Sequence, residues 1–230
     1  HTSQVITMEE SPSKAIRMKP DASIGVAFKI VKEERACGVV SPGNTGAMMA
    51  AGLFISGTMP GIARPAIASL IPRAGNLPPT ILLDAGANVD SHAYQLVQFA
   101  LMGDFYARYA IPCDCPRIAL LSNGTEPSKG NDIIRAAAVM LASLEELNFI
   151  GYVEGRDVVR DAADVIVCDG FVGNIVLKTI EGSAGLVVDS IRGHVEKSWR
   201  GKIGMWLANP MFHTLFRDKL DPSFYGGAPL

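Results

Sequence analysis

The stretch DVIVCDGFVGNIVLK, residues 164–178, contains the pattern that decides the fold. Its first half is a short apolar run that ends at Cys168, and such runs are typical of strands buried on both faces. Asp169-Gly170 turns the chain, and a helical pattern follows over 172–197. A buried strand that leads directly into a helix is the repeating unit of proteins with parallel sheets.

The same unit recurs along the chain. We expect strands at 36–40, 66–71, 80–86, 117–122, 148–153 and 164–170, and helices at 23–34, 44–56, 91–109, 130–146 and 172–197. This alternation predicts an α/β protein with three layers, in which helices cover both faces of a largely parallel sheet. We expect a single domain over 1–230, with an amphipathic helical segment at 192–220 that projects from it.

The composition limits the classes of function. The chain has 230 residues, of which 48% are hydrophobic, so it can bury a sizeable core. Its net charge is −2 and its basic residues form no stripe, which argues against a nucleic-acid partner. No uninterrupted apolar run reaches the roughly 18 residues of a transmembrane helix. We expect no signal peptide, since no charged-then-apolar leader pattern is visible from His1 onward.

The cysteines are Cys37, Cys113, Cys115 and Cys168. Their spacing is neither a disulfide framework nor a zinc site, so we expect free thiols in a reducing cytoplasm. Cys113-Asp114-Cys115 gives only a weak indication of metal binding. Cys168 could be a thiol nucleophile, but its type and place favour a small buried strand residue.

Gly-Asn stands at the start of three expected helices, at Asn44, Asn131 and Asn174. Ligands of open parallel sheets bind beyond the carboxyl ends of the strands, and a helix N-terminus suits an anion there. Each asparagine could equally be a helix cap, and both interpretations remain open. The candidate phosphate-binding residues are Gly43, Asn44, Thr45, Gly46, Asn131, Asp169, Gly170 and Gly173.

Lys129 is the cation that such an anion site would use. It directly precedes Gly130-Asn131 in the loop SNGTEPSKGND, from which it could reach an oxyanion, although a solvated loop lysine is the alternative. Asp84, Asp169 and Glu126 could orient it or carry a proton, or could cap turns.

Candidates for a protein nucleophile are poor. No G-x-S-x-G elbow is present, and His92 is expected in the first turn of a helix. The pattern therefore suits a reaction whose nucleophile is itself an anion, such as phosphate.

The sequence resembles the bacterial phosphate acyltransferases of phospholipid synthesis, the PlsX family. The resemblance covers essentially the whole chain, through SPGNTGAMMAAGLF, LLDAGANVD, LMGDFYA, GTEPSKGN, NFIGYVEGRD, DGFVGNIVLKTIEG and YGGAPL. It implies an isocitrate/isopropylmalate-dehydrogenase-like fold related to phosphate acetyltransferases, a homodimer and no cofactor. It also implies acyl transfer from acyl-carrier protein to inorganic phosphate. The acyl phosphate would feed a downstream glycerol-3-phosphate acyltransferase.

The sequence departs from the family at both ends. The family's first strand with its Gly-Gly-Asp loop, and its closing helix, have no counterpart here. With the resemblance in view, we expect Gly43–Gly46 and Gly173-Asn174 to hold phosphate through N–H groups. Lys129 and Asn174 are the expected catalytic residues, with Lys129 neutralising phosphate or the tetrahedral oxyanion and Asn174 positioning one of them.

A tryptophan stripe lies in the segment VEKSWRGKIGMWLANPMF. Trp199, Ile203, Trp206 and Leu207 share one helical face, and we expect this face to contact a membrane surface. Neighbouring lysines and arginines suit anionic lipid. A core-facing or dimer-facing helix is the alternative, and Pro210 is expected to end the helix or begin a turn.

Two other functions remain as rivals. A decarboxylating dehydrogenase on the same fold would need clustered aspartates for a divalent metal and a nicotinamide pocket, and the sequence shows neither as a set. A membrane-docked adaptor would bind lipid enzymes without catalysis. Turnover with NAD and magnesium would identify the dehydrogenase, and release of acyl-carrier protein with and without phosphate would test for the acyltransferase.

Overall fold

The computed structural model describes residues 1–75, 77–215 and 228–229. They divide into two compact units, of which the first comprises His1–Ala66 with Pro229 and the second comprises the described residues of Ile67–Ala228. The sequence pattern led us to expect one domain, whereas the segment before Ile67 forms a unit of helices of its own. The strand–helix alternation lies in the second unit.

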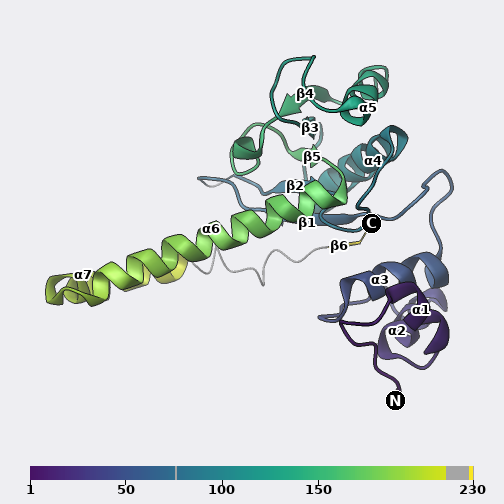
Figure 1. Cartoon of the computed structure of the whole chain (residues 1–230), viewed down its shortest axis with the longest axis horizontal. Helices are drawn as coiled ribbons and strands as arrows, with labels where there is room; N and C mark the ends of the chain where they lie inside the picture. Colours follow the sequence, from purple (N-terminus) through teal and green to yellow (C-terminus); the bar gives the residue numbers. More distant parts are fainter. Residues whose placement is uncertain (76, 216–227, 230) are drawn as a thin grey trace. The chain divides into compact units, whose positions relative to one another are not determined.

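The second unit contains the sheet, apart from Pro229 of its last strand (Figure 1). Its strands are β1 (Ile67–Ile71), β2 (Thr80–Leu83), β3 (Ile118–Leu121), β4 (Phe149–Val153), β5 (Val165–Val167) and β6 (Ala228–Pro229), in the spatial order β4-β3-β5-β2-β1-β6. Strands β2, β5, β3 and β4 run parallel, and β1 is antiparallel to β2. The expected strands at 66–71, 80–86, 117–122, 148–153 and 164–170 are confirmed, and so is the largely parallel sheet.

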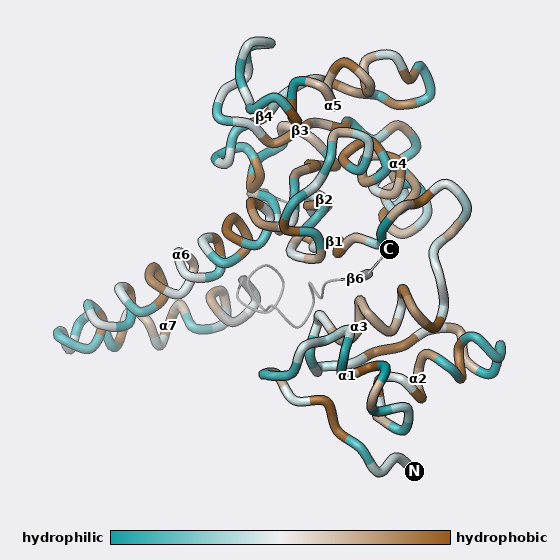
Figure 2. The backbone as a smooth tube through the Cα atoms, turned by 45° about the vertical axis from the view of Figure 1, so that its right-hand side comes forward, coloured by the Kyte–Doolittle hydropathy of each residue, from teal (hydrophilic) through white to brown (hydrophobic). Residues whose placement is uncertain are grey.

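Helices cover both faces of this sheet. The helices of the second unit are α4 (Ala93–Ala110), α5 (Asp132–Ala142), the short 3-10 helix η2 (Gly155–Asp157), α6 (Gly170–Glu196) and α7 (Trp199–Leu215), of which α7 packs on α6. Gly103 of α4 lies against Val165, while Val176 of α6 packs in the cluster that contains Ile166. Successive strand residues point to opposite faces, so α4 and α6 lie on opposite sides. The expected three-layer arrangement is confirmed, and Figure 2 shows the apolar strands between these helices.

The strand register brings the loops after β2, β3 and β5 to one edge of the sheet. Leu83 pairs with Val167, and Val167 pairs with Leu120. Because these strands are parallel, their carboxyl ends meet at the same edge. The segments that follow them, 84–92, 122–131 and 168–174, therefore lead away from that edge, where open α/β sheets bind ligands.

An ion-pair cluster lies at the opposite, amino edge. Arg73, whose side chain is 3% exposed, donates to Asp161 and Asp164 at 2.9 Å each, and Arg117 donates to Asp164 at 3.0 Å. Burial alone would raise the pKa of Asp164, but the hydrogen bonds from Arg117 and Arg73 outweigh burial and lower that pKa to about 2. Asp164 thus joins segments far apart in the sequence, and sequence analysis did not identify this cluster.

The first unit is built from short helices: α1 (Pro12–Met18), α2 (Ser23–Lys32), α3 (Thr45–Ala51) and the π-helical turn η1 (Gly52–Ser56). Ile24, Phe28 and Ala47 belong to its core. The expected strand at 36–40 is wrong, because this segment pairs with none of the strands that the structure describes and Val40 is fully exposed. The expected helices at 23–34 and 44–56 are confirmed, the second with its π-helical end.

The long C-terminal helices differ from expectation at two points. Helix α6 begins at Gly170, two residues before the expected start, because the Asp169 side chain accepts a hydrogen bond from Val172 N at 2.9 Å and caps it. Pro210 lies inside α7 and does not end it, so that part of the expectation is wrong. Helices α6 and α7 pack against each other, and residues 216–220 of the expected projecting segment lie outside the described residues.

Candidate functional site

Asp84 begins the loop after β2, and the structure shows that its carboxylate holds this loop together. The residue is fully buried. Its Oδ1 accepts hydrogen bonds from the backbone of Ile67 (2.9 Å), Gly86 (3.1 Å) and Ala87 (3.0 Å). Its Oδ2 accepts from the N–H of Asn88 at 2.6 Å and from the Asn88 amide at 2.9 Å. Asp84 therefore stabilises the loop and does not contact Lys129.

The first turn of α6 docks on this loop through two glycines. The N–H of Gly170 donates to Asn88 O at 2.7 Å. A Cβ added to Gly170 would lie 2.8 Å from Asn88 N, and one added to Gly173 would lie 1.9 Å from Asp84 O. The helix can approach the strand end this closely only because both positions lack a side chain.

Hydrogen bonds in this first turn also occupy the N–H group of Gly173, which we expected to bind phosphate, and those of its neighbours Gly170 and Val172. Besides the Gly170 bond, the N–H of Gly173 donates to Asp169 O at 2.9 Å, and the N–H of Val172 donates to the Asp169 side chain. What the structure shows for Gly170 and Gly173 is close packing, and what it shows for Asp169 is a helix cap.

The three Gly-Asn sequences have different structural roles. Asn44 Oδ1 accepts from Ala47 N at 3.0 Å and caps α3, and Asn131 Oδ1 accepts from Ile134 N at 2.9 Å and caps α5. Asn174 is no cap, since it lies a full turn inside a helix that Asp169 already caps. Its exposed amide has no hydrogen-bond partner among the residues that the structure describes. A Cβ at Gly86 would lie 3.5 Å from the Asn174 Cβ, so the side chain stands beside the Asp84 loop.

Lys129 lies in the loop after β3, as predicted. The loop closes on itself through Lys129 N to Glu126 O (2.9 Å) and Gly130 N to Asn123 Oδ1 (2.9 Å). The aliphatic part of the Lys129 side chain lies against Gly124, where an added Cβ would lie 2.7 Å from Lys129 Cγ. The side chain is exposed, and within the described ranges its ammonium has no carboxylate or other hydrogen-bond partner.

The remaining candidates for proton transfer or nucleophilic attack have structural positions. Cys168 is buried in the core, and burial raises the pKa of its thiol, so its predicted burial is confirmed, although it lies one residue beyond the end of β5. His92 directly precedes α4, and its backbone N–H donates to Gln95 Oε1 at 2.8 Å. Neither side chain offers an activated nucleophile.

The candidate loop Gly43–Gly46 belongs to the first unit, whereas Lys129, Asn131, Asp169 and Asn174 belong to the second. Asn44 fixes this loop twice, because it caps α3 and its amide donates to Thr7 O at 3.1 Å. Gly43 and Thr45 are exposed beside it. The loop is thus held in shape within its own unit.

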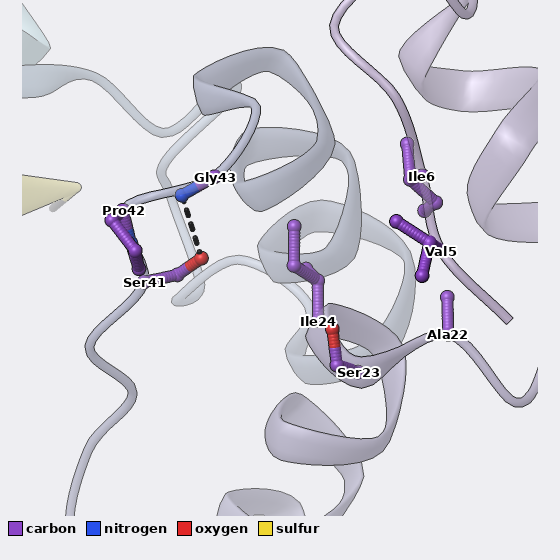
Figure 3. A pocket seen from close by; sticks show the side chains of 8 residues that line it. All are labelled: Val5, Ile6, Ala22, Ser23, Ile24, Ser41, Pro42 and Gly43. Carbon is purple, nitrogen blue, oxygen red and sulfur yellow. Dashed lines mark hydrogen bonds between the residues drawn. The ribbon is translucent and has the colours of Figure 1, made fainter. Parts of the chain in front are cut away.

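A small cavity of about 210 Å³ adjoins this loop (Figure 3). It is lined by Val5, Ile6, Ala22, Ser23, Ile24, Ser41, Pro42 and Gly43. The Ser41 hydroxyl faces Gly43 and accepts a hydrogen bond from its N–H at 3.1 Å. The lining is mainly apolar. In the described part of the chain, no three His, Cys, Asp or Glu side chains gather as a metal site would require.

The expected membrane stripe lies on α7 and is exposed. Trp199 is 68% exposed and Trp206 is 75% exposed, and Ile203 and Leu207 are exposed as well. A core-facing role for this stripe is therefore not seen in the described residues. Arg200 stacks on the Trp199 ring, with 5.4 Å from its guanidinium carbon to the ring centroid.

Helix α6 is long and apolar enough to cross a membrane, judged by length and composition alone. However, its first three turns pack on the sheet through Val176, Leu177 and Ile180. The part beyond Glu181 is shorter than the about 20 residues that a span needs, and it contains Asp189 and Arg192. These features favour a helix that projects from the sheet (Figure 1).

Comparisons with known proteins give a consistent result. The sequence model of a family described as fatty acid synthesis protein matches residues 1–230. The chain is 49% identical to a phosphate acyltransferase of Geotalea uraniireducens and 46% identical to one of Syntrophotalea carbinolica. Both matches cover 100% of this chain and 65% of the relative, so the chain spans about 65% of the length of these curated relatives.

Solved structures with a similar fold include phosphotransacetylases. One from Streptococcus pyogenes has a TM-score of 0.61 and 25% sequence identity, and the match covers 75% of this chain and 58% of that one. A phosphotransacetylase from Staphylococcus aureus has a TM-score of 0.54 and 20% sequence identity, and the match covers 77% of this chain and 60% of that one. The second likeness concerns the fold alone.

Proposed function

This chain belongs to the family of fatty acid synthesis proteins, and we propose that the whole protein transfers a long-chain acyl group from acyl-carrier protein to inorganic phosphate. The observation that carries the proposal is the pair Lys129 and Asn174. A cation and an amide, both without partners among the described residues, follow the adjacent parallel strands β3 and β5 at their carboxyl ends. The phosphate acyltransferase names of the relatives support the choice of reaction.

The proposed chemistry asks little of a protein acid or base. A phosphate oxygen attacks the thioester carbonyl, the new C–O bond forms, and the C–S bond then breaks to release a thiolate. Phosphate is partly dianionic near neutral pH, and a thiol with a pKa of about 8.5 is a good leaving group. What the protein must supply is proximity and stabilisation of negative charge.

Each candidate residue has a place in this scheme. Lys129 neutralises the phosphate or the tetrahedral oxyanion, and the Asn174 amide donates to one of them. Gly170 and Gly173 contribute by letting the first turn of α6 approach the strand end, since their N–H groups are already bonded. In the first unit, Gly43 and Thr45 are exposed and Gly46 is partly buried; they remain candidate phosphate-binding residues, with Asn44 holding the shape of their loop. Asn131 fixes the start of α5 beside Lys129.

The reaction is tested by thiol release. Full-length protein is incubated with palmitoyl acyl-carrier protein, and the free thiol is measured with a disulfide reagent with and without inorganic phosphate. We expect release only with phosphate. Phosphate-independent release would indicate a thioesterase, and no release in either case would favour a non-catalytic adaptor.

The role of Asn174 is tested by Asn174→Asp. A new carboxylate would repel bound phosphate. Two like unit charges about 4 Å apart, at an effective dielectric constant near 20, repel each other with an energy of about 4 kcal/mol. We therefore expect KM for phosphate to rise at least about tenfold. Stability should change by no more than about 0.5 kcal/mol, because the exposed side chain caps nothing.

The control for Asn174→Asp is Asn148→Asp, which adds the same charge at the amino end of β4. Asn148 precedes Phe149, at the edge of the sheet opposite the candidate site. A normal KM for phosphate in Asn174→Asp, or an equal rise in both variants, would contradict the role given to Asn174.

The remaining features of the proposal concern assembly and location. They are a homodimer, an isocitrate/isopropylmalate-dehydrogenase-like fold, a cytoplasmic location, and delivery of acyl phosphate to a glycerol-3-phosphate acyltransferase. We also propose peripheral membrane contact through Trp199, Ile203, Trp206 and Leu207. Exposure of all four side chains supports this contact, and so does the positive charge of Lys197, Arg200 and Lys202 near them.

Membrane contact is tested with Trp199→Ser/Trp206→Ser. We expect the wild-type protein to sediment with anionic vesicles in a salt-sensitive way, and the double variant to bind at least about tenfold more weakly, because two large apolar side chains are lost. The control is Phe105→Ser/Tyr109→Ser, which removes another exposed pair of aromatic rings, stacked 5.8 Å apart on α4. Equal vesicle binding by both double variants, or loss of the dimer in the tryptophan variant, would assign the stripe to another interface.

A further inference from the structure

The buried carboxylate of Asp84 has no place in the proposed chemistry, yet it is the most heavily bonded acidic group near the candidate site. Among the described residues, it accepts hydrogen bonds from the N–H groups of residues 67 and 86–88 and from the Asn88 amide. A fully buried carboxylate is costly unless its lone pairs are satisfied, so these bonds hold the loop in one conformation.

The same loop is joined to the start of α6 from two directions. The N–H of Asp84 donates to Cys168 O at 3.0 Å, and Asn88 O accepts from the N–H of Gly170 at 2.7 Å. Asp84 O fills the space where Gly173 would have a side chain. A change in the carboxylate's hydrogen bonds would therefore move the first turn of the helix.

Asn174 directly follows Gly173 in α6, and its side chain lies beside Gly86 of the 84–88 loop. We propose that Asp84 is a positioning residue, which sets the location of the Asn174 amide through the joint between the 84–88 loop and the first turn of α6. This inference rests on the function proposed above, in which Asn174 contacts phosphate or the oxyanion. The Asp84 carboxylate itself touches neither substrate.

The effect of losing this joint should appear in turnover. Misplacing a catalytic group by about 1 Å can cost as much as 100-fold in rate. Asp84→Asn keeps the shape of the side chain but replaces one acceptor oxygen with an NH₂ group. This group is a donor, so it cannot accept the N–H hydrogen bonds that the oxygen accepted. Because part of the network remains, we expect kcat to fall about tenfold.

A double-mutant cycle tests whether Asp84 acts through Asn174. Full-length wild type, Asp84→Asn, Asn174→Ala and the double variant are compared in phosphate-dependent thiol release, with the folded fraction of each measured by thermal unfolding. If Asp84 only positions Asn174, Asp84→Asn should change kcat less than about twofold once Asn174 is already alanine. Independent, multiplicative losses would overturn the positioning role.

Two further variants keep the test decisive. Asp161→Asn removes a carboxylate at the amino edge of the sheet and should leave kcat unchanged in the folded protein. If Asp84→Asn does not fold, Gly170→Ala replaces it in the cycle, because its Cβ would press on Asn88 and on Asp84 Oδ2 at 2.8 Å. Normal kcat in the folded Asp84 variant, or in Gly170→Ala if it is used, would overturn the proposal.

The cycle also separates this inference from the proposed function. Full activity of Asn174→Ala alone would contradict the catalytic role of Asn174, and the positioning role would fall with it. A strong loss in Asn174→Ala combined with multiplicative losses in the double variant would contradict only the positioning role of Asp84.

Discussion

Lys129→Ala in the full-length protein is expected to lower kcat by about 10²–10³, equivalent to about 2.7–4 kcal/mol of transition-state stabilisation. The reason is that Lys129 would neutralise charge that develops on the thioester oxygen or is carried by phosphate. Its ammonium has no partner within the described residues that would compete for it. The measurement is steady-state thiol release from acyl-carrier protein at saturating phosphate.

Two variants show whether the loss is specific. Lys129→Arg retains the charge with a different geometry and should recover part of the lost rate. Lys178→Ala should keep near-normal turnover, because Lys178 lies farther along α6 and its ammonium pairs with Glu181 at 2.8 Å. Near-normal kcat in Lys129→Ala, or the same loss in both alanine variants, would contradict the role of Lys129.

Asp164→Ala is expected to lower the free energy of unfolding by about 3 kcal/mol, which is at the lower end of the range for breaking a buried ion pair. The substitution removes the acceptor for Arg73 and Arg117, and the Arg73 side chain is 3% exposed. Asp161 still accepts from Arg73, so the loss is not complete. Urea unfolding at pH 7 measures the difference.

The effect of Asp164 should depend on pH. The pKa of Asp164 falls on folding, from about 3.9 in the unfolded chain to about 2. Its carboxylate therefore contributes its full stabilisation above the unfolded-state pKa. This contribution is lost as the pH falls through the folded-state pKa. The difference between wild type and Asp164→Ala should therefore be constant at neutral pH and shrink between about pH 4 and pH 2.

The control for Asp164→Ala is Asp132→Ala, which removes an exposed carboxylate that pairs with Arg135. It should cost less than about 1 kcal/mol, as surface ion pairs do. An equally small loss in Asp164→Ala, or a difference from wild type that persists unchanged at pH 2, would show that the Asp164 cluster does not stabilise the fold.

The parallel sheet could be predicted from sequence because its strands are buried on both faces. Runs such as 81–83, 118–121 and 165–167 are apolar throughout, and few other structures accommodate such runs. The run at 36–40 is equally apolar but forms no strand, since a strand also needs a neighbour, and the run itself does not reveal one. Helix α1 was missed because it is short and begins with Pro12, whose preference for a first helical turn is only a local signal.

The candidate site was predictable in its position but not in the role of each residue. Three asparagines have the same local sequence signal, yet Asn44 and Asn131 cap helices while Asn174 does not. The difference comes from Asp169, which caps α6 first and places Asn174 one turn inside the helix. A strand-end carboxylate such as Asp84 is visible in the sequence, but its complete burial depends on segments that only folding brings together.

The central claim is that a phosphate oxygen attacks the acyl thioester, and labelled phosphate tests this most directly. Full-length protein is supplied with palmitoyl acyl-carrier protein and inorganic phosphate in which every oxygen is ¹⁸O, and the product is examined intact by mass spectrometry. We predict acyl phosphate that retains all the labelled oxygens, with one of them bonded to the acyl carbon, and much less of it from Lys129→Ala. Unlabelled fatty acid as the first product, formed at the same rate without phosphate, would contradict the account.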